Sequence, residues 1–120
     1  MGFESILKDV VLGVEGATGA IFVDNGGEAV QWCARGDADR LKLRAAYLAV
    51  LVQASRSCCA RLNLGDISQI MLEYEGAWLI AEAIDASYFI MLELAHWANL
   101  AKAQNQLSLA TDNLRQEIAA

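Results

Sequence analysis

The residues that could carry chemistry in this chain are few and scattered. His96 is its only histidine, and a nucleophilic triad would also need a serine or cysteine with an acid nearby, which no spacing in the sequence selects. Asp37 and Asp39 are two carboxylates without further ligands, so we expect them to cap a helix instead of holding a metal. We therefore predict no catalytic residue and no metal site, and we expect that the protein is not an enzyme.

The glycine-rich residues 13–19 resemble a phosphate-binding loop in composition only. The segment lacks the Lys-Ser/Thr pair that contacts phosphates and magnesium, and it precedes a predicted strand instead of a helix. Glu15 would also repel an anion. Because glycine supplies the backbone freedom that tight turns need, turn geometry explains the pattern, and we expect no bound cofactor.

The cysteines and the amino terminus both indicate an intracellular protein. Cys33, Cys58 and Cys59 do not match a metal-ligand spacing, because adjacent helical residues point about 100° apart and cannot converge on one ion. We interpret all three as small buried apolar residues in a reducing compartment. The amino-terminal residues include acids where a signal peptide has bases, and no apolar run is long enough to cross a bilayer. These features predict a cytoplasmic protein that is not attached to a membrane.

The composition indicates one domain with an unusually apolar surface. The 120 residues are 56% hydrophobic and only 20% charged, which is rich for so small a monomer and suggests oligomerisation. The length fits a single domain covering residues 1–120. The net charge of −6 opposes binding to a phosphate backbone, so we expect no nucleic-acid partner.

The hydrophobic periodicity predicts the order helix, strand, strand, helix, strand, strand, strand, helix. Helices are expected from Phe3 to about Gly13, over residues 40–62 and after Asn99, with strands over 17–24, 28–34, 67–75, 77–84 and 88–95. Several strands have apolar residues on both faces, which indicates a sheet covered on both sides. We therefore expect an α/β fold of the α+β sandwich type, with a five-stranded, mainly antiparallel sheet between helices.

Residues 40–62 are the most informative stretch, because they contain no Gly, Pro, Asp or Glu and are apolar around much of the predicted helix. The apolar residues span an arc of roughly 200°, whereas a helix that covers one core needs about 100°. We therefore expect the helix to pack on its own sheet and also on a second copy of the chain. The residues expected at this dimer interface are Leu43, Tyr47, Val50, Leu51, Ala54 and Cys58.

The same helix carries five of the nine basic residues and no acid. Its narrow polar side combines charged and small residues in a strip that another protein could approach closely: Lys42, Ala46, Ala49, Gln53 and Arg56. Two interpretations remain open, since the strip either docks a partner protein or is a solvated face whose long side chains cover apolar neighbours. Arg44 lies within the apolar arc, where it either inserts into a partner or extends its charge to solvent.

A further pattern surrounds the first predicted strand. A leucine- and valine-rich helix over residues 7–14 is followed by Gly-Ala-Thr-Gly-Ala-Ile-Phe-Val-Asp at 16–24 and an Asn-Gly-Gly turn at 25–27. This arrangement resembles the opening of the roadblock (dynein light chain) family. Asn99-Leu100-Ala101 is similar to the Asn-Leu-Gly that begins the last helix of that family, with alanine replacing the glycine. The resemblance extends over essentially the whole chain and points to the prokaryotic, MglB-like members.

The resemblance implies a dimer in which the long central helices of two subunits lie side by side and their sheets join across the interface. The prokaryotic members that this chain resembles look like regulators and scaffolds of small Ras-like GTPases. For this chain the resemblance implies a non-enzymatic homodimer that binds a small Ras-like GTPase through residues 40–62. Two alternatives remain: a structural adaptor in a motor or polar-localisation complex without nucleotide-state preference, and a small-molecule sensor with a cavity lined by Trp78 and Phe89.

Overall fold

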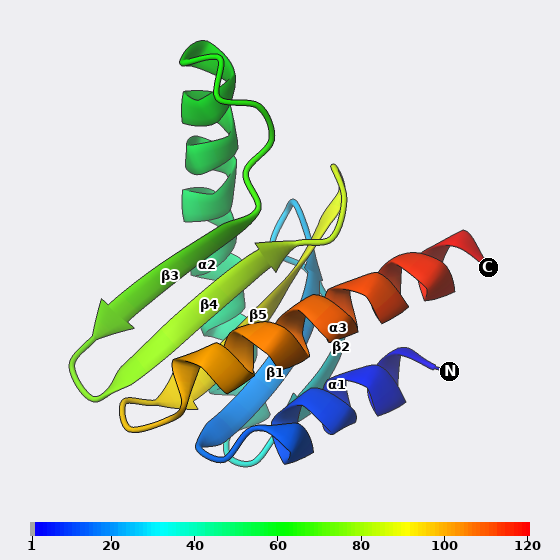
Figure 1. Cartoon of the computed structure of the whole chain (residues 1–120), viewed down its shortest axis with the longest axis vertical. Helices are drawn as coiled ribbons and strands as arrows, with labels where there is room; N and C mark the ends of the chain where they lie inside the picture. Colours follow the sequence, from blue (N-terminus) through cyan, green and yellow to red (C-terminus); the bar gives the residue numbers. More distant parts are fainter. Residues whose placement is uncertain (1) are drawn as a thin grey trace.

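The computed structural model describes residues 2–120 and has the predicted order of helices and strands (Figure 1). A five-stranded sheet lies between α1 and α3 on one face and α2 on the other (Figure 1). The elements are α1 (Phe3–Gly13), β1 (Ala17–Asp24), β2 (Ala29–Ala34), α2 (Ala38–Arg61), β3 (Gln69–Tyr74), β4 (Ala77–Ala83), β5 (Tyr88–Ala95) and α3 (Leu100–Ala119). The predicted α+β fold is confirmed.

The strands have the spatial order β2-β1-β5-β4-β3, and every neighbouring pair is antiparallel. The β1–β2 turn is held by the Asp24 carboxylate, which accepts hydrogen bonds from the backbone amides of Gly26 and Glu28, both at 2.9 Å. Gly27 completes this turn with a φ of +86°, a left-handed conformation that glycine adopts without a steric penalty. The hairpin thus forms one side of the sheet, and β3 forms the opposite edge.

Alternation along the strands divides the core into two layers. Phe22, Ile90 and Leu92 are buried in the layer shared with α1 and α3. Ile21 and Phe89 are buried in the second layer, which is shared with α2. Because β1 and β5 are buried on both faces, the prediction of a sheet covered on both sides is confirmed.

The helix α2 begins and ends slightly earlier than predicted, and Asp37 is its cap. The Asp37 carboxylate accepts hydrogen bonds from the backbone amides of Asp39 at 2.9 Å and Arg40 at 3.3 Å. Asp39 lies in the first turn, where its negative charge interacts favourably with the helix dipole. The predicted cap of α3 is also confirmed, since the Asn99 side chain accepts a hydrogen bond from the Lys102 amide at 3.1 Å.

The connection between α2 and β3 is the main departure from the predicted boundaries. The sequence predicted a strand over residues 67–75, but β3 begins only at Gln69. Asn63 and Gly65 have φ values of +56° and +83°, and residues in this left-handed region turn the chain instead of extending it. Figure 1 shows that the carboxyl-terminal half of α2 extends beyond the sheet. The connection must therefore return alongside the helix before the chain reaches the sheet.

Candidate interaction surface

The helix α2 presents apolar residues on two sides, and the sheet covers only one of them. Leu41 and Leu48 are buried against the sheet. On the opposite side, Leu43, Tyr47 and Val50 are 58%, 72% and 69% exposed. The wide apolar arc predicted from the sequence is therefore present, and it exceeds the surface that the sheet of the same chain can cover.

All six residues that the sequence assigned to a dimer interface are exposed on this second side. We call them the exposed α2 face, which consists of Leu43, Tyr47, Val50, Leu51, Ala54 and Cys58. An apolar groove of about 350 Å³ continues this face toward the sheet, and it is lined from the strands by Leu72 and Leu79. Covering such a surface with another apolar surface is favourable, because it removes apolar atoms from water.

The edge strand β3 borders the same groove. Within residues 2–120, β3 pairs with β4 and with no other strand, so its outer edge can accept a further strand. Met71 and Leu72 are exposed on this strand. An edge strand beside an exposed apolar helix can bind a second chain by sheet extension combined with helix packing.

The polar strip predicted on α2 is turned toward the β1–β2 hairpin. Ala49 is only 3% exposed, and a Cβ placed on Gly27 of the hairpin turn would lie 3.4 Å from the Ala49 Cβ. The Lys42 ammonium lies 3.6 Å from the centre of the Trp32 ring in β2. The expectation that Ala49 is accessible to another protein is therefore wrong, because the hairpin packs over it. The other four members of the strip are half-buried.

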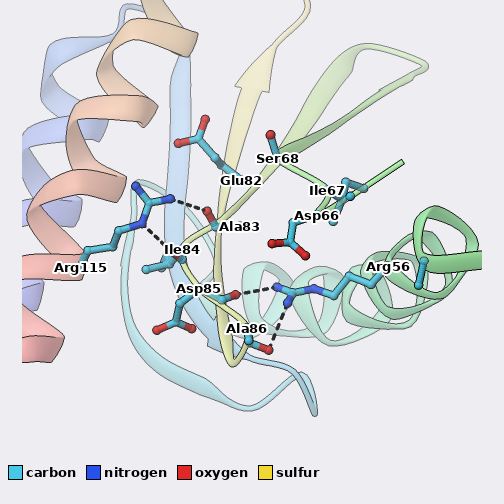
Figure 2. Close-up of a pocket in the computed structure, with 12 residues that line it drawn as sticks. Arg56, Asp66, Ile67, Ser68, Glu82, Ala83, Ile84, Asp85, Ala86 and Arg115 are labelled. Atoms are coloured by element: carbon cyan, nitrogen blue, oxygen red, sulfur yellow. Dashed lines mark hydrogen bonds between the residues drawn. The ribbon is translucent and has the colours of Figure 1, made fainter. Parts of the chain in front are cut away.

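Arg56, the last residue of the strip, anchors the β4–β5 turn. Its two Nη atoms donate hydrogen bonds to the carbonyl oxygens of Ala86 and Asp85, both at 3.1 Å (Figure 2). From α3, the Nε of Arg115 donates to the Ile84 carbonyl at 2.6 Å (Figure 2). Both arginines line a pocket of about 440 Å³. Because these guanidinium groups bind the backbone of their own chain, their first effect is to stabilise the turn.

Arg44 forms an ion pair that neither interpretation of the sequence included. Its guanidinium donates a hydrogen bond to the Glu93 carboxylate on β5, and the Thr18 hydroxyl donates to the same carboxylate at 2.7 Å. The hydrogen bond to Glu93 raises the pKa of Arg44 above its ordinary value, and burial opposes this shift. The two residues belong to elements that are distant in the sequence, so no local pattern could have revealed the pair.

Two further expectations are corrected by the structure. Trp78 packs on the α1 and α3 side of the sheet and Phe89 on the α2 side, so the two residues cannot line one sensor cavity. Cys58 is exposed, although the sequence suggested that it was buried, and the other two cysteines are half-buried. The exposure of Cys58 follows from its place on the side of α2 that the sheet does not cover.

The remaining chemically capable residues stay dispersed. His96 is exposed at the junction between β5 and α3. In the described part of the chain, no group of three or more His, Cys, Asp or Glu residues could hold a metal ion. Over the same residues, no helix combines the length and the apolar character needed to cross a membrane. The exposed α2 face is therefore the feature that best indicates a function.

Comparison with known proteins identifies the same architecture. The family model described as the Roadblock/LC7 domain matches residues 6–93, whereas no curated protein has significant sequence similarity to the chain. The Roadblock/LC7 domain from Streptomyces avermitilis is similar with a TM-score of 0.90 and 18% identity, covering 98% of each chain. The gliding protein MglB from Thermus thermophilus has a TM-score of 0.83 and 16% identity, covering 93% of this chain and 84% of that one. MglC from Myxococcus xanthus has a TM-score of 0.71 and 23% identity, covering 98% and 99%.

The family match and the structural similarity agree with each other. The matched residues run from α1 to β5 and include the whole of α2 with its exposed face. These two solved structures superpose on 98% and 93% of the chain at low sequence identity, which shows that the fold is shared. The chain therefore belongs to the Roadblock/LC7 family.

Proposed function

We propose that this Roadblock/LC7 protein is a non-enzymatic homodimer that regulates or scaffolds a small Ras-like GTPase. The observation that carries the proposal is the exposed α2 face, where Leu43, Tyr47 and Val50 are each more than half exposed. Membership of the family supports a role in protein assembly. The prokaryotic members that the sequence resembles supply the class of partner.

A second copy of the chain is the occupant that suits the exposed α2 face. The face continues into the groove beside β3, and β3 is an edge strand. A two-fold axis would place each of these surfaces against its own counterpart, as in most homodimers. The two α2 helices would then bury their apolar residues, and each Å² of apolar surface removed from water would contribute about 25 cal/mol.

The partner-binding surface in this proposal is the basic flank of α2. It consists of the half-buried strip residues Lys42, Ala46, Gln53 and Arg56, without the buried Ala49. Residues 40–62 hold five of the nine basic residues of a chain whose net charge is −6. This asymmetry would steer an acidic surface of the GTPase toward α2, and a dimer would present the flank twice.

Affinity purification of the tagged chain from its native cell, followed by binding measurements with each GTPase recovered, tests this proposal. A regulator should bind the GTP-analogue and GDP forms with dissociation constants that differ by about tenfold or more. Lys42→Glu should weaken this binding, whereas Lys102→Glu, which changes an exposed lysine on α3, should not. Recovery of no GTPase under either nucleotide condition would contradict the proposal.

The alternative is a structural adaptor in a motor or polar-localisation complex. Lys42 contacts Trp32, and Arg56 is hydrogen-bonded to the β4–β5 turn. These contacts favour the adaptor, because they leave fewer polar groups of α2 free to distinguish the GTP-bound form of a GTPase from its GDP-bound form. An adaptor should bind its partner with the same dissociation constant in both nucleotide forms. The same pair of titrations therefore separates the two functions.

A further inference from the structure

Three arginines converge on a hollow beside the first turns of α2. Arg35 follows β2, and Arg40 and Arg44 lie on α2 itself. All three line a hollow of about 400 Å³, whose other polar side chains are Thr18, Asp37 and Glu93. Three arginines against two carboxylates give this lining a net charge of +1, although the net charge of the chain is −6.

The acidic groups of the hollow already have partners. The Glu93 carboxylate accepts hydrogen bonds from Arg44 and from the Thr18 hydroxyl. Asp37 accepts hydrogen bonds from the backbone amides of the first turn of α2. The helix terminus is therefore capped, and any remaining capacity to bind an anion comes from the arginine side chains.

The arginine side chains retain free hydrogen-bond donors. A guanidinium group has five N–H donors. Arg35 uses its Nε on the Ala17 carbonyl at 2.9 Å and its Nη2 on the Val11 carbonyl at 3.3 Å, which leaves Nη1. Arg44 uses Nη1 on Glu93. Among residues 2–120, no hydrogen bond or ion pair involves the Arg40 side chain. The hollow thus has more donors than its own acceptors can satisfy.

We propose that this hollow binds the phosphate group of a small phosphorylated compound. Guanidinium groups donate bidentate hydrogen bonds to oxyanions, and a phosphate group offers several oxygens to several arginines at once. A carboxylate has only two oxygens and could accept hydrogen bonds from fewer of these arginines. Arg44 already has a carboxylate partner in Glu93. The bonds to the carbonyls of Ala17 and Val11 hold Arg35 in place before a ligand arrives, which reduces the entropic cost of binding.

Titration of the ¹⁵N-labelled protein with sodium pyrophosphate tests the proposal, with ionic strength held constant by sodium chloride. We expect saturable shifts of the amide resonances of Thr18, Glu93 and residues 35–44. Arg40→Gln should raise the dissociation constant for pyrophosphate by about tenfold, the loss expected for one charged hydrogen-bonding group. Arg61→Gln, which removes an exposed charge at the other end of α2, is the matched control and should leave the dissociation constant unchanged.

Three results would overturn the proposal. Shifts that do not saturate, or an equal loss of affinity in the Arg40→Gln and Arg61→Gln variants, would show only general attraction of anions to α2. A parallel titration with a hexaglutamate peptide distinguishes the source of the oxyanion. Binding of that peptide as tightly as pyrophosphate, with the same dependence on Arg40, would assign the hollow to carboxylates of a protein segment. The proposal does not rest on dimerisation or on GTPase binding, which the solution mass and the titrations with nucleotide-bound GTPase test separately.

Discussion

Gly27 determines how closely the β1–β2 hairpin approaches α2. A Cβ at this position would lie 3.0 Å from the Ala46 Cα and 3.1 Å from the Ala46 carbonyl oxygen. Backbone atoms of a helix cannot move aside as the end of a flexible side chain can, so this approach requires a residue without a Cβ. The same close approach buries Ala49. One glycine in the turn therefore explains why Ala49, at the centre of the predicted strip, is not free.

We expect Gly27→Ala to lower the free energy of unfolding by about 2–4 kcal/mol, the sum of overpacking and of a left-handed backbone with a Cβ. Urea unfolding followed by circular dichroism measures this loss. Gly76→Ala is the matched control, because Gly76 has a similar φ of +83° and a Cβ placed there would meet none of the described residues within 4 Å. The control should cost only about 1 kcal/mol. Equal losses in the two variants would show that backbone conformation alone accounts for the effect.

The two sides of α2 have different roles. Leu48 is 5% exposed and holds the helix on the sheet. Val50, only two positions later, is 69% exposed. Successive helical residues point about 100° apart, so these two residues face nearly opposite sides of α2. A charge at position 48 should disturb the fold, whereas a charge at position 50 should disturb only the packing of a second chain on the helix. Substitutions along α2 can therefore separate folding from assembly.

Val50→Arg should give a folded protein that is monomeric. The new charge is solvated in the monomer, but in a dimer it would be buried without an opposite charge to pair with. Circular dichroism reports the fold, and light scattering reports the mass. Leu109→Arg is the control, because Leu109 is 55% exposed on α3, away from α2, and its variant should stay dimeric. A Val50→Arg protein with the mass of a dimer would place the interface elsewhere.

The whole molecule combines an acidic net charge with an apolar surface that its own elements do not cover. The chain has a net charge of −6, which keeps copies apart in general. The exposed α2 face and the edge of β3 provide one place where the attraction between apolar surfaces can exceed this repulsion. Association is thus expected at a single surface and not at random.

If the protein is a dimer, its melting temperature should rise by several degrees when its concentration is raised a hundredfold. In a dimer the second chain acts as a ligand of the first, so a higher chain concentration favours the folded dimer over unfolded chains. A hundredfold increase in concentration stabilises the dimer by about 2.7 kcal/mol. Differential scanning calorimetry at several concentrations checks this, together with a solution mass of twice 13.0 kDa. A melting temperature independent of concentration, with the mass of one chain, would contradict dimerisation.

Most of the elements could be predicted from the sequence, because their signals lie within a few residues of one another. The caps at Asp37 and Asn99 and the turn at 25–27 are local hydrogen-bonding patterns. The width of the apolar arc is likewise a property of one helix, so the sequence alone indicated a surface that the sheet leaves exposed, including Tyr47. The start of β3 was less predictable, because left-handed residues in the preceding connection delay the strand.

Only the tertiary structure decided which contacts α2 makes. The hairpin rather than solvent covers Ala49, Glu93 pairs with Arg44, and Arg35 joins Arg40 in one hollow. Each of these contacts joins residues from different elements, and their geometry depends on the rotation of the helix over the sheet. That rotation is set by the simultaneous packing of many side chains in a dense core. The sequence by itself therefore determined the elements and the excess apolar surface, and the packing of those elements determined which polar groups meet.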